Sequence, residues 1–498
     1  MKPTRLLLAV RPRAALFTAV LLLTSLTLLG LSCAKAPGIR LELSDSGWLD
    51  AQAFLAAHPL PPELRIVNEG SAATLRFRSI LGEGQAAPAR NDCGLDALPP
   101  SSLRVIARRY LAHPLAFAQG PLGLSAAEAA AGGLVELSSI EPPSRAAPID
   151  GLLPGQAGYP FAERVELYID GEAPASLLAW LAALPETPEG PTLLGAVGDM
   201  IVHRLFQPAI EKPSAGPELY FGDTLPILRS YDYLIGNLEG PVSTRGTGNP
   251  IKKYQFRHTP AVLKAFADAG LDHAAFANNH TLDFGLDAFY DTLDAIDALG
   301  LGRSGAGRNL AEASAPYELT LKGQELSIFA IARYPVESRG YSPAHAAAGP
   351  DSPGILTDPA LLRRRIEEES ARGRFVVVIA HAGHEYVPRP IPEIKALYRS
   401  FVDAGADLVL GGHPHVLQGM ESYKGSTIAY SLGNFIFIGL NEDPPAQRSG
   451  IFSFVIDGGV VRGYNVVPVR AGNERTMLDP GINAAESYFM GLVKGLNE

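Results

Sequence analysis

Two histidines separated by one proline, His413 and His415, follow the apolar run Asp-Leu-Val-Leu at 407–410 and the pair Gly411–Gly412. In an extended His-x-His segment both side chains point to the same side, so one strand end offers two nitrogens to one cluster. The intervening proline stiffens the backbone and lowers the entropy lost when both rings bind a common ligand. The spacing therefore predicts that both rings belong to one ligand-binding cluster.

Carboxylate, amide and imidazole side chains also end four other apolar runs. They are Asp199, the pair Asn237 and Glu239, the pair Asn279 and His280, and His381. Each alone fits a turn, a helix cap or a core histidine, but their recurrence at strand ends favours one shared metal site. Oxygen and nitrogen ligands of this kind suit Mn²⁺, Fe or Zn²⁺, so we expect a divalent metal, with room for one or two ions.

A pair of ions would activate a water molecule and clamp the oxygens of a phosphoryl or acyl centre, which defines a hydrolase. In that case His280 is the candidate for protonating the leaving group, with Asp283 as its orienting partner. Glu385 is a second acid or base candidate, or else a solvated loop carboxylate. Lys253 and Arg257, together with Asn237, are candidates for contacting an anionic substrate; the alternative for the two cations is a solvated edge strand.

The elements that must position these side chains follow one order, in which a helix with an apolar face is followed by glycine and then by an apolar strand. Helical spacing predicts helices over 260–269, 286–299 and 392–404, ended by Gly270, Gly300 and Gly405. Strands follow the first and the last of these. The pattern predicts an α/β or layered α+β domain, in which ligand groups gather beyond the strand ends.

Length and charge set the outer limits. The 498 residues suggest two or three domains, and 47% hydrophobic with 19% charged residues describes a globular chain. The formal net charge of −10 argues against nucleic acid as a partner. A proline-containing segment at 185–191 predicts a boundary between a domain over 38–187 and a domain over 192–475, which leaves a tail at 476–498.

The N-terminus has the order of a secretory signal. Basic residues up to Arg13 precede an uncharged run from Ala14 to Ser32, so residues 1–33 predict export and a location in the cell envelope. Cys33 follows that run and is a candidate for acylation, as in bacterial lipoproteins, although Gly30 stands where such signals usually have leucine. The alternative is an uncleaved membrane anchor, because about 18 to 20 apolar residues can span a bilayer.

Seven segments resemble the CapA family, which is associated with bacterial poly-γ-glutamate capsule synthesis, and occur in the order seen there. They are Gly-Asp-Met (198–200), Asn-Leu-Glu-Gly-Pro (237–241), Ala-Asn-Asn-His-Thr-Leu-Asp-Phe-Gly (277–285), Gly-Ala-Gly-Arg-Asn-Leu (305–310), His-Ala-Gly-His-Glu-Tyr (381–386), Gly-Gly-His-Pro-His-Val (411–416) and Tyr-Ser-Leu-Gly-Asn-Phe (430–435). The family domain is similar to calcineurin-like metallophosphoesterases. The resemblance implies a four-layer α/β/β/α sandwich over about residues 192–470.

The same resemblance implies a role for each matching residue. Asp199 would be the first metal ligand, Glu239 the bridging carboxylate and Asn279 the amide ligand, with His280 as the acid. The remaining ligands would be His381, His413 and His415. Two departures stand out: Met200 occupies the place of a ligand histidine, for which His203 is the substitute, and Asn237-Leu-Glu239 replaces the second carboxylate motif.

Three functions follow from these observations. The first is an exported, anchored protein of capsular poly-γ-glutamate synthesis or export, working on an anionic polymer alongside other capsule-synthesis proteins. The second is a metal-dependent phosphoesterase or amide hydrolase unrelated to capsule. The third is a solute-binding lipoprotein, because residues 149–169 and the helical pattern after them resemble the end of a phosphate-type periplasmic binding protein; the alternative is a shortened, non-binding relic.

Overall fold

The computed structural model describes residues 38–43, 49, 51–62, 64–66, 73–81, 103–116, 124–149, 152–157, 159–171, 173–184, 190–202, 216–438, 444–471 and 476–478. The signal segment with Cys33, the residue His203 and the tail after 478 lie outside the described residues. In the part that is described, no helix combines the length and the apolar character needed to cross a membrane.

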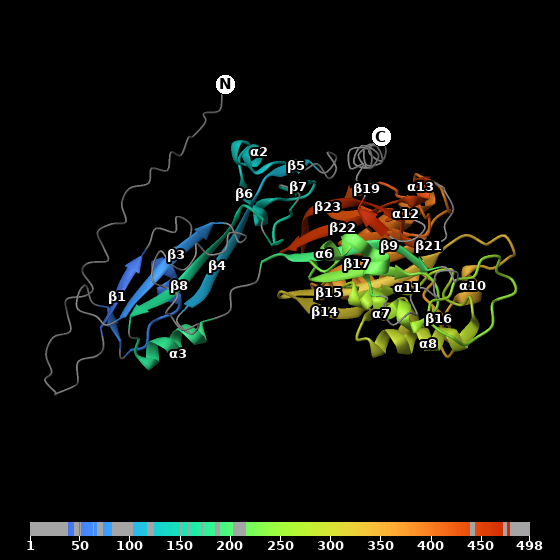
Figure 1. The fold of residues 1–498 in the computed structure, drawn as a ribbon, viewed down its shortest axis with the longest axis horizontal. Helices are drawn as coiled ribbons and strands as arrows, with labels where there is room; N and C mark the ends of the chain where they lie inside the picture. The colour runs from blue at the N-terminus through green and yellow to red at the C-terminus, as the bar shows by residue number, and fades with distance from the viewer. Residues whose placement is uncertain are drawn as a thin grey trace, which may run out of the picture.

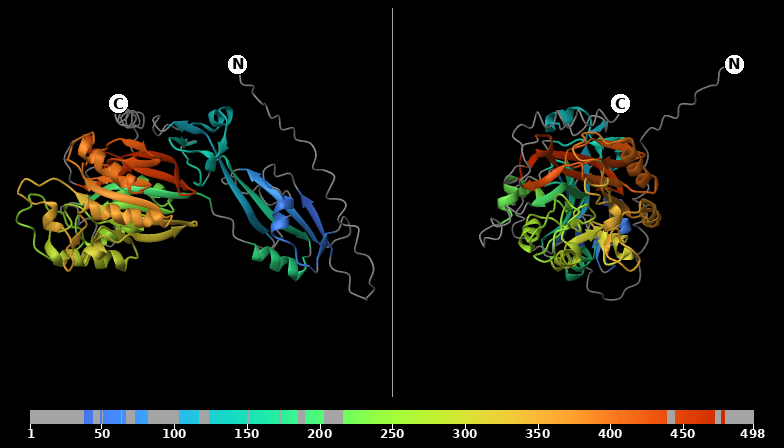
Figure 2. Two further views of the ribbon diagram at one scale, coloured as in Figure 1. Left: turned by 180° about the vertical axis from the view of Figure 1, so that it is seen from behind. Right: turned by 90° about the vertical axis from the view of Figure 1, so that its right-hand side faces the viewer.

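A six-stranded sheet forms the smaller of the two lobes seen in Figures 1 and 2. Its strands, in spatial order, are β2 (Arg65–Ile66), β1 (Gly38–Leu43), β3 (Ala73–Leu81), β8 (Ala162–Gly171), β4 (Leu103–Ala112) and β6 (Val135–Glu136). The helices of this part are α1 (Ala51–Ala57), α2 (Ala126–Ala131) and α3 (Ala175–Ala183), with a 3₁₀ turn at Leu137–Ser139. Leu177 and Leu181 of α3 pack on Leu167 and Ile169 of β8, which closes a small apolar core.

Two strands from this part of the chain extend the main sheet of the larger lobe. β5 (Pro114–Ala116) pairs with β7 (Ser144–Ala146), and β7 pairs with β23 (Val460–Ala471). Leu193 and Val455 of the larger lobe share a buried cluster with Ile149 and Tyr159. The strands β5 and β7, with Ile149 and Tyr159, are therefore packed on the larger lobe, while the division of the chain at 185–191 stays a prediction.

A ten-stranded sheet is the first of the two central layers of the larger lobe. Beyond β5, β7 and β23 it contains β12 (Gly302–Ser304), β11 (His273–Ala275), β10 (Tyr233–Leu238), β9 (Thr192–Val202), β21 (Asn434–Ile438), β22 (Arg448–Asp457) and β24 (Thr476–Leu478). β9 is parallel to β10 and β21 and antiparallel to β22.

A six-stranded sheet is the second central layer. Its order is β14 (Tyr317–Leu321), β15 (Gln324–Arg333), β17 (Phe375–Ala382), β18 (Leu408–Gly412), β20 (Ser426–Ala429) and β19 (Met420–Tyr423). A separate pair joins β13 (Ala306–Gly307) and β16 (Gly354–Ile355). The helices are α5 (Glu218–Phe221), α6 (Leu225–Leu228), α7 (Pro260–Asp268), α8 (Gly285–Ala298), α9 (Leu310–Ala313), α10 (Pro343–Ala346), α11 (Pro359–Ala371), α12 (Pro392–Asp403) and α13 (Pro444–Gln447), with a 3₁₀ turn at Gly222–Thr224.

The alternation of side chains along β17 shows how the layers stack. Val376 and Val378 pack outward in one core with residues of α11 and α12, whereas Val377 and Ile379 belong to the core between the two sheets. Residues of α7 and α8 cover the far side of the ten-stranded sheet, as Figure 1 also shows. The order helix, sheet, sheet, helix is the four-layer α/β/β/α sandwich expected from the sequence.

The three expected helices are confirmed as α7, α8 and α12, and the glycines after them, Gly270, Gly300 and Gly405, all have positive φ. The expected apolar face of α8 is correct for Phe289, Leu293 and Ile296, which are buried. It is wrong for Leu286, which is 49% exposed, because it lies in the first turn and the buried stripe begins one turn later.

The same pair of hydrogen bonds from an aspartate recurs at the starts of three parallel strands. The carboxylate of Asp232 accepts a hydrogen bond from Leu193 N, that of Asp272 from Leu234 N, and that of Asp407 from Val376 N. In each pair the backbone N–H of the aspartate returns a hydrogen bond to the carbonyl of the same partner. These pairs hold neighbouring strands in register at the end opposite the candidate site.

Replacing Asp407 with asparagine should flatten the pH dependence of stability. Burial raises the pKa of the Asp407 carboxyl to about 6, although the hydrogen bond from Val376 N acts to lower this pKa. A folded pKa above the unfolded value favours the folded state at low pH, and this contribution is lost as pH rises through 6. Between pH 4.5 and 7.5, urea unfolding should show wild type losing roughly 2 kcal/mol relative to Asp407→Asn.

Asp403→Asn is the matched control for this measurement. Asp403 is exposed, and its bond to Lys424 lowers the pKa of the carboxyl, so its titration falls below the measured range. Its stability difference from wild type should be constant between the two pH values. Parallel curves for wild type and Asp407→Asn would contradict the assignment of Asp407.

Candidate metal centre

His381 and Asn237 reach the space between the sheets because of strand alternation. Val377 and Ile379 of β17 face that space, and His381 continues the same series. On β10, Asn237 donates from Nδ2 to Nδ1 of His381 over 3.2 Å. Glu239 follows directly after β10 and is fully buried, with Oε1 3.7 Å from Nε2 of His381.

Asp199 lies at the centre of the site, but it does not end its strand as expected. β9 continues to Val202, and the pairing with β10 shifts register next to Asp199. A bulge of this kind redirects a side chain without ending the strand. Asp199 Oδ1 accepts from Asn237 Nδ2 at 2.7 Å, and its Oδ2 accepts from the backbone N of His413 at 3.1 Å.

His413 and His415 meet in the site, but the expected extended geometry is wrong. β18 ends at Gly412, and the two histidines have φ of 89° and 56°, which is left-handed backbone. The ring centroids are 6.0 Å apart, and His415 Nδ1 lies 3.2 Å from Asp199 Oδ2. The turn after the strand, and not an extended segment, brings both rings to one place.

The loop after β11 supplies the amide of Asn279 and the imidazole of His280. Asn279 Oδ1 accepts from His381 Nε2 at 2.9 Å. His280 Nδ1 lies 2.6 Å from Asp283 Oδ2, and its Nε2 lies 3.9 Å from Glu239 Oε1. Asp283 is thus placed as the orienting partner of His280, as the sequence predicted, and Asn278 secures the loop by donating to Leu238 O.

The role of the three expected substrate contacts stays a prediction, and the structure gives only their positions. Asn237 is engaged inside the cluster, where its Oδ1 also accepts from Asn278. Lys253 is exposed, with Nζ over the ring of Tyr254 at 4.7 Å, and Arg257 lies over Phe284 at 4.2 Å. These two cations stand on a loop rather than on the edge strand considered as the alternative.

Sequence reasoning missed Lys252, the neighbour of Lys253. Lys252 is 1% exposed, and Nζ lies 3.0 Å from a carboxylate oxygen of Asp283 and 3.0 Å from Glu337. It also donates to the backbone oxygen of Asn279 at 2.5 Å. No pattern in the sequence distinguishes a buried from an exposed lysine in a loop, so only the fold identifies the one that contacts the site.

Two further groups support the cluster from behind. Asn434, in the last of the seven segments that resemble the CapA family, faces Nδ1 of His415 with Oδ1 at 2.8 Å. Gly412 lies so close to Asp199 that a Cβ there would be 2.7 Å from Oδ1. The close approach of β18 to β9 therefore requires glycine at 412.

Glu385 lies at the outer side of the cluster. Its carboxylate is exposed, and one of its oxygens forms a group with ring nitrogens of His413 and His415, all within 4.8 Å of one another. Asp199, Glu239 and His381 form a second, fully buried group by the same measure. His384, next to Glu385 in the chain, is exposed.

The charges of the site are strongly interdependent. Burial, together with Asp199, raises the pKa of the Glu239 carboxyl well above its usual range. Burial alone would lower the pKa of His415, but Glu239 and Asp199 outweigh it and raise this pKa to about 10. Burial and the neighbouring imidazoles lower the pKa of His381 and of His413. A divalent cation among these groups would favour an ionised Glu239 and neutral imidazoles.

The residues fit a divalent metal because polar atoms at the centre lack partners. Glu239 Oε1 and both ring nitrogens of His413 are buried, and none of the three has a hydrogen-bond partner. A buried polar atom without a partner costs about 1 to 3 kcal/mol, so three in one cluster call for a ligand. Carboxylate oxygens and imidazole nitrogens are the donors that Mn²⁺, Fe²⁺ and Zn²⁺ accept.

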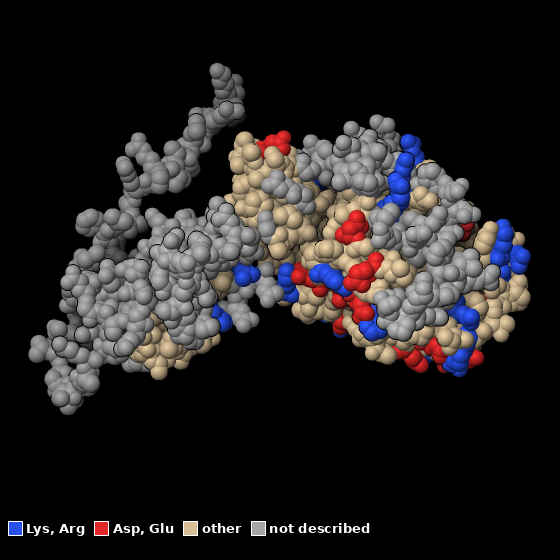
Figure 3. Space-filling view, viewed as in Figure 1, with Lys and Arg blue, Asp and Glu red and all other residues tan. Residues whose placement is uncertain are grey.

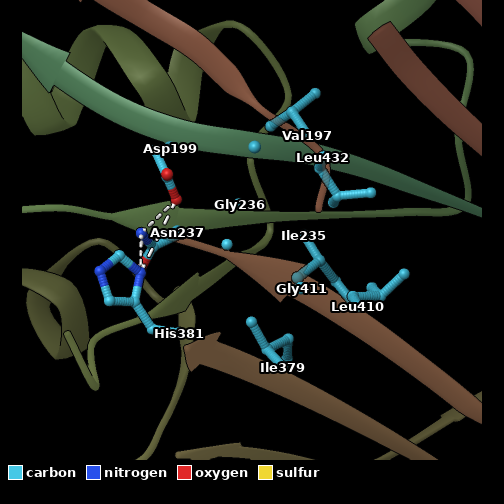
Figure 4. A pocket seen from close by; sticks show the side chains of 12 residues that line it. Val197, Asp199, Ile235, Gly236, Asn237, Ile379, His381, Leu410, Gly411 and Leu432 are labelled. Carbon is cyan, nitrogen blue, oxygen red and sulfur yellow. Dashed lines mark hydrogen bonds and ion pairs between the residues drawn. The ribbon is translucent and has the colours of Figure 1, made fainter. Parts of the chain in front are cut away.

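An apolar pocket lies beside the polar cluster, as Figure 4 shows. Asp199, Asn237 and His381 form its polar end, where dashed lines mark their contacts. Five aliphatic side chains line the rest: Val197, Ile235, Ile379, Leu410 and Leu432. This apolar wall keeps the polar groups in a medium of low dielectric constant, which strengthens their interactions with any bound ion.

Replacing Lys252 with methionine should destabilise the larger lobe. The substitution removes the cation between Asp283 and Glu337 and leaves Asp283 Oδ1, a buried carboxylate oxygen, without its charged partner, which costs about 3 kcal/mol or more. Lys253→Met is the matched control, because its side chain is exposed, and it should change the free energy of unfolding by less than about 0.5 kcal/mol. Equal denaturation midpoints for the two variants would contradict this role of Lys252.

Comparisons with known proteins match this part of the chain. The family model described as bacterial capsule synthesis protein PGA_cap matches residues 193–438. The PGA biosynthesis protein CapA of Bacillus subtilis is 33% identical over 243 residues, which are 48% of this chain and 62% of that protein. The capsule biosynthesis protein CapA of Bacillus anthracis is 33% identical over 252 residues, which are 48% of this chain and 58% of that protein.

The match thus spans less than two thirds of the length of either relative. Among solved structures, the 5'-nucleotidase of Candida albicans is 13% identical, with a TM-score of 0.33 over 61% of this chain and 57% of that chain. A likeness this weak adds nothing to the architecture, which rests on the two sheets and their helices.

Proposed function

We propose that this chain acts in the synthesis or export of capsular poly-γ-glutamate through a divalent-metal site, because residues 193–438 match the model of the bacterial capsule synthesis protein family. The names of its relatives support the capsule role, and the donor set between the two sheets supports the metal. On this proposal the substrate is an anionic polymer or a phosphoester, and other capsule-synthesis proteins are its partners.

The observation that carries the proposal is the set of buried, unpartnered atoms at the centre of the site. Glu239 Oε1 and the two ring nitrogens of His413 converge with Asp199, Asn279 and His381 from separate strands and loops. A core built only for stability would pair or exclude these groups. Their retention is the signature of a site that holds a cation.

The chain's own residues suit a hydrolytic step. Bound divalent metal would supply an activated water molecule and would stabilise negative charge on a phosphoryl or acyl oxygen. His280 is held by Asp283 in an orientation that leaves Nε2 toward Glu239, where it can give a proton to a leaving group. Lys252 braces this pair through Asp283 and the carbonyl of Asn279.

A second candidate function is metal or polymer binding without turnover. Met200, in the place of a ligand histidine, is 1% exposed and packs against Gly236 in the apolar core. The main sheet therefore offers no nitrogen at that position. A site with fewer nitrogen ligands could serve a capsule assembly factor that binds the polymer and does not cleave it.

We propose further that the chain is exported and that Cys33 anchors it to the membrane. The order of basic and apolar residues in 1–33 supports this location.

Charged side chains of both signs are interspersed on the face of the larger lobe seen in Figure 3. That the protein does not bind nucleic acid stays a prediction.

Turnover separates the two candidate functions. The full chain, purified in detergent and supplied with Mn²⁺, should hydrolyse bis(p-nitrophenyl) phosphate or release fragments from γ-linked glutamate polymer. Metal analysis of the same preparation should find bound ions. Bound metal and polymer without turnover would support the second candidate, and a preparation that binds no metal would overturn the metal-site proposal.

A further inference from the structure

We propose that Glu385 is a metal ligand, which holds a second divalent ion together with His413 and His415 at the outer side of the cluster. The inference rests on the proposed metal site and extends it. The geometric basis is that one carboxylate oxygen and two ring nitrogens lie within 4.8 Å of one another, separate from the group of Asp199, Glu239 and His381.

His413 gives the first independent support. Its side chain is 2% exposed, yet neither ring nitrogen has a hydrogen-bond partner. A neutral imidazole has one donor and one acceptor, so burying both without partners is costly. The ring lies between the two groups, with centroids 4.8 Å from His381 and 6.0 Å from His415. Binding of a metal ion would give the buried His413 ring the partner that no hydrogen bond provides.

The backbone gives the second support. Among the described residues, five non-glycine positions have clearly left-handed φ, and three of them, Tyr386, His413 and His415, lie in the two loops that meet at Glu385. The other two, Lys322 and Lys424, precede glycine in hairpin turns, where such backbone is ordinary. Such strain persists when the surrounding structure holds it, most often at functional sites.

The two strained loops are also joined to each other. Tyr386 N donates to Pro414 O at 2.8 Å, which ties the loop after β17 to the loop after β18. This bond sits one residue after Glu385 and between the two histidines, so it fixes the carboxylate relative to both rings. A solvated loop carboxylate would need no such connection.

The donor set suits the chemistry of a working ion. Two imidazoles and one carboxylate bind Zn²⁺, Mn²⁺ or Fe²⁺ and leave coordination positions open. Because Glu385 is exposed whereas Asp199 and Glu239 are fully buried, the open positions of this ion face solvent. This ion is therefore the one that an anionic substrate reaches first. Glu385 then supplies a ligand atom, as the methionine at 200 does not.

The test counts ions bound by wild type, Glu385→Gln and the neighbouring control His384→Gln. Each full-length protein is stripped with chelator, dialysed against Mn²⁺, and analysed for metal and for spin coupling between Mn²⁺ ions by electron paramagnetic resonance. Wild type and His384→Gln should bind two ions with a coupled signal. Glu385→Gln should bind one, with an uncoupled signal, and before Mn²⁺ is added its melting temperature should equal that of chelator-stripped wild type.

Each other outcome is decisive. Two coupled ions in Glu385→Gln, or a single ion in wild type, would overturn the inference and leave the proposed metal site standing. No ion in wild type would instead overturn the proposed function itself. Because Glu385 is exposed, the glutamine variant is expected to fold, and the melting temperature checks this.

Discussion

The double variant Asp199→Ala, His413→Ala will retain no stoichiometric divalent metal. Asp199 contacts Asn237, His415 and the backbone of His413, and the His413 ring belongs to the outer group of ligand atoms. The two substitutions therefore remove one ligand from each of the two groups. The metal content of the purified, dialysed protein should fall from at least one ion per chain to background, because losing a ligand weakens binding more than the roughly 10- to 100-fold that losing a ligand's hydrogen-bond partner costs.

The double variant Asp351→Ala, His384→Ala is the control, because both residues are exposed and lie outside the ligand groups. It should keep the wild-type metal content. Stoichiometric metal in the Asp199→Ala, His413→Ala protein would place the ion elsewhere and would refute the assignment of these ligands.

Replacing His280 with glutamine should abolish most of the phosphodiester turnover while leaving bound metal in place. Nδ1 of His280 lies 2.6 Å from Asp283 Oδ2, so Nε2 is directed toward the carboxylate of Glu239. Removing a positioned general acid lowers the rate by about 10² to 10⁴. The measurement is kcat for bis(p-nitrophenyl) phosphate with Mn²⁺, together with metal content.

A substrate with a better leaving group sharpens this experiment. If His280 protonates the leaving oxygen, the deficit of His280→Gln should shrink for the less basic leaving group, whereas a general loss of structure would affect all substrates equally. An unchanged kcat in His280→Gln would show that this histidine is not the acid. His384→Gln should match wild type for both substrates, since its exposed ring lies outside the ligand groups.

The sequence predicted the local elements well because their signals are local. The apolar spacing of α7 and α12 and the glycines at 270 and 405 determine where each helix begins and ends, and the structure agrees within one residue. Strand alternation likewise predicts the direction of His381, because Val377 and Ile379 precede it on the same face. The seven segments that resemble the CapA family identified the family and the four layers.

Where the prediction was wrong or incomplete, the deciding interactions are between segments distant in the chain. The left-handed backbone of His413 and His415 is held by Asp199, more than 200 residues earlier, and a rule for extended strands cannot anticipate it. The bulge beside Asp199 depends on its pairing with β10.

The sequence by itself determined which residue types are available for chemistry, which segments form helices and strands, and which family the larger lobe resembles. Only the tertiary structure decided that Lys252 is buried against the site and Lys253 is exposed, and that Glu385 stands beside His413 and His415. The reason is physical: burial and ligand geometry depend on how the sheets and loops pack in three dimensions, and neighbouring residues in a loop carry no periodic signal of that packing.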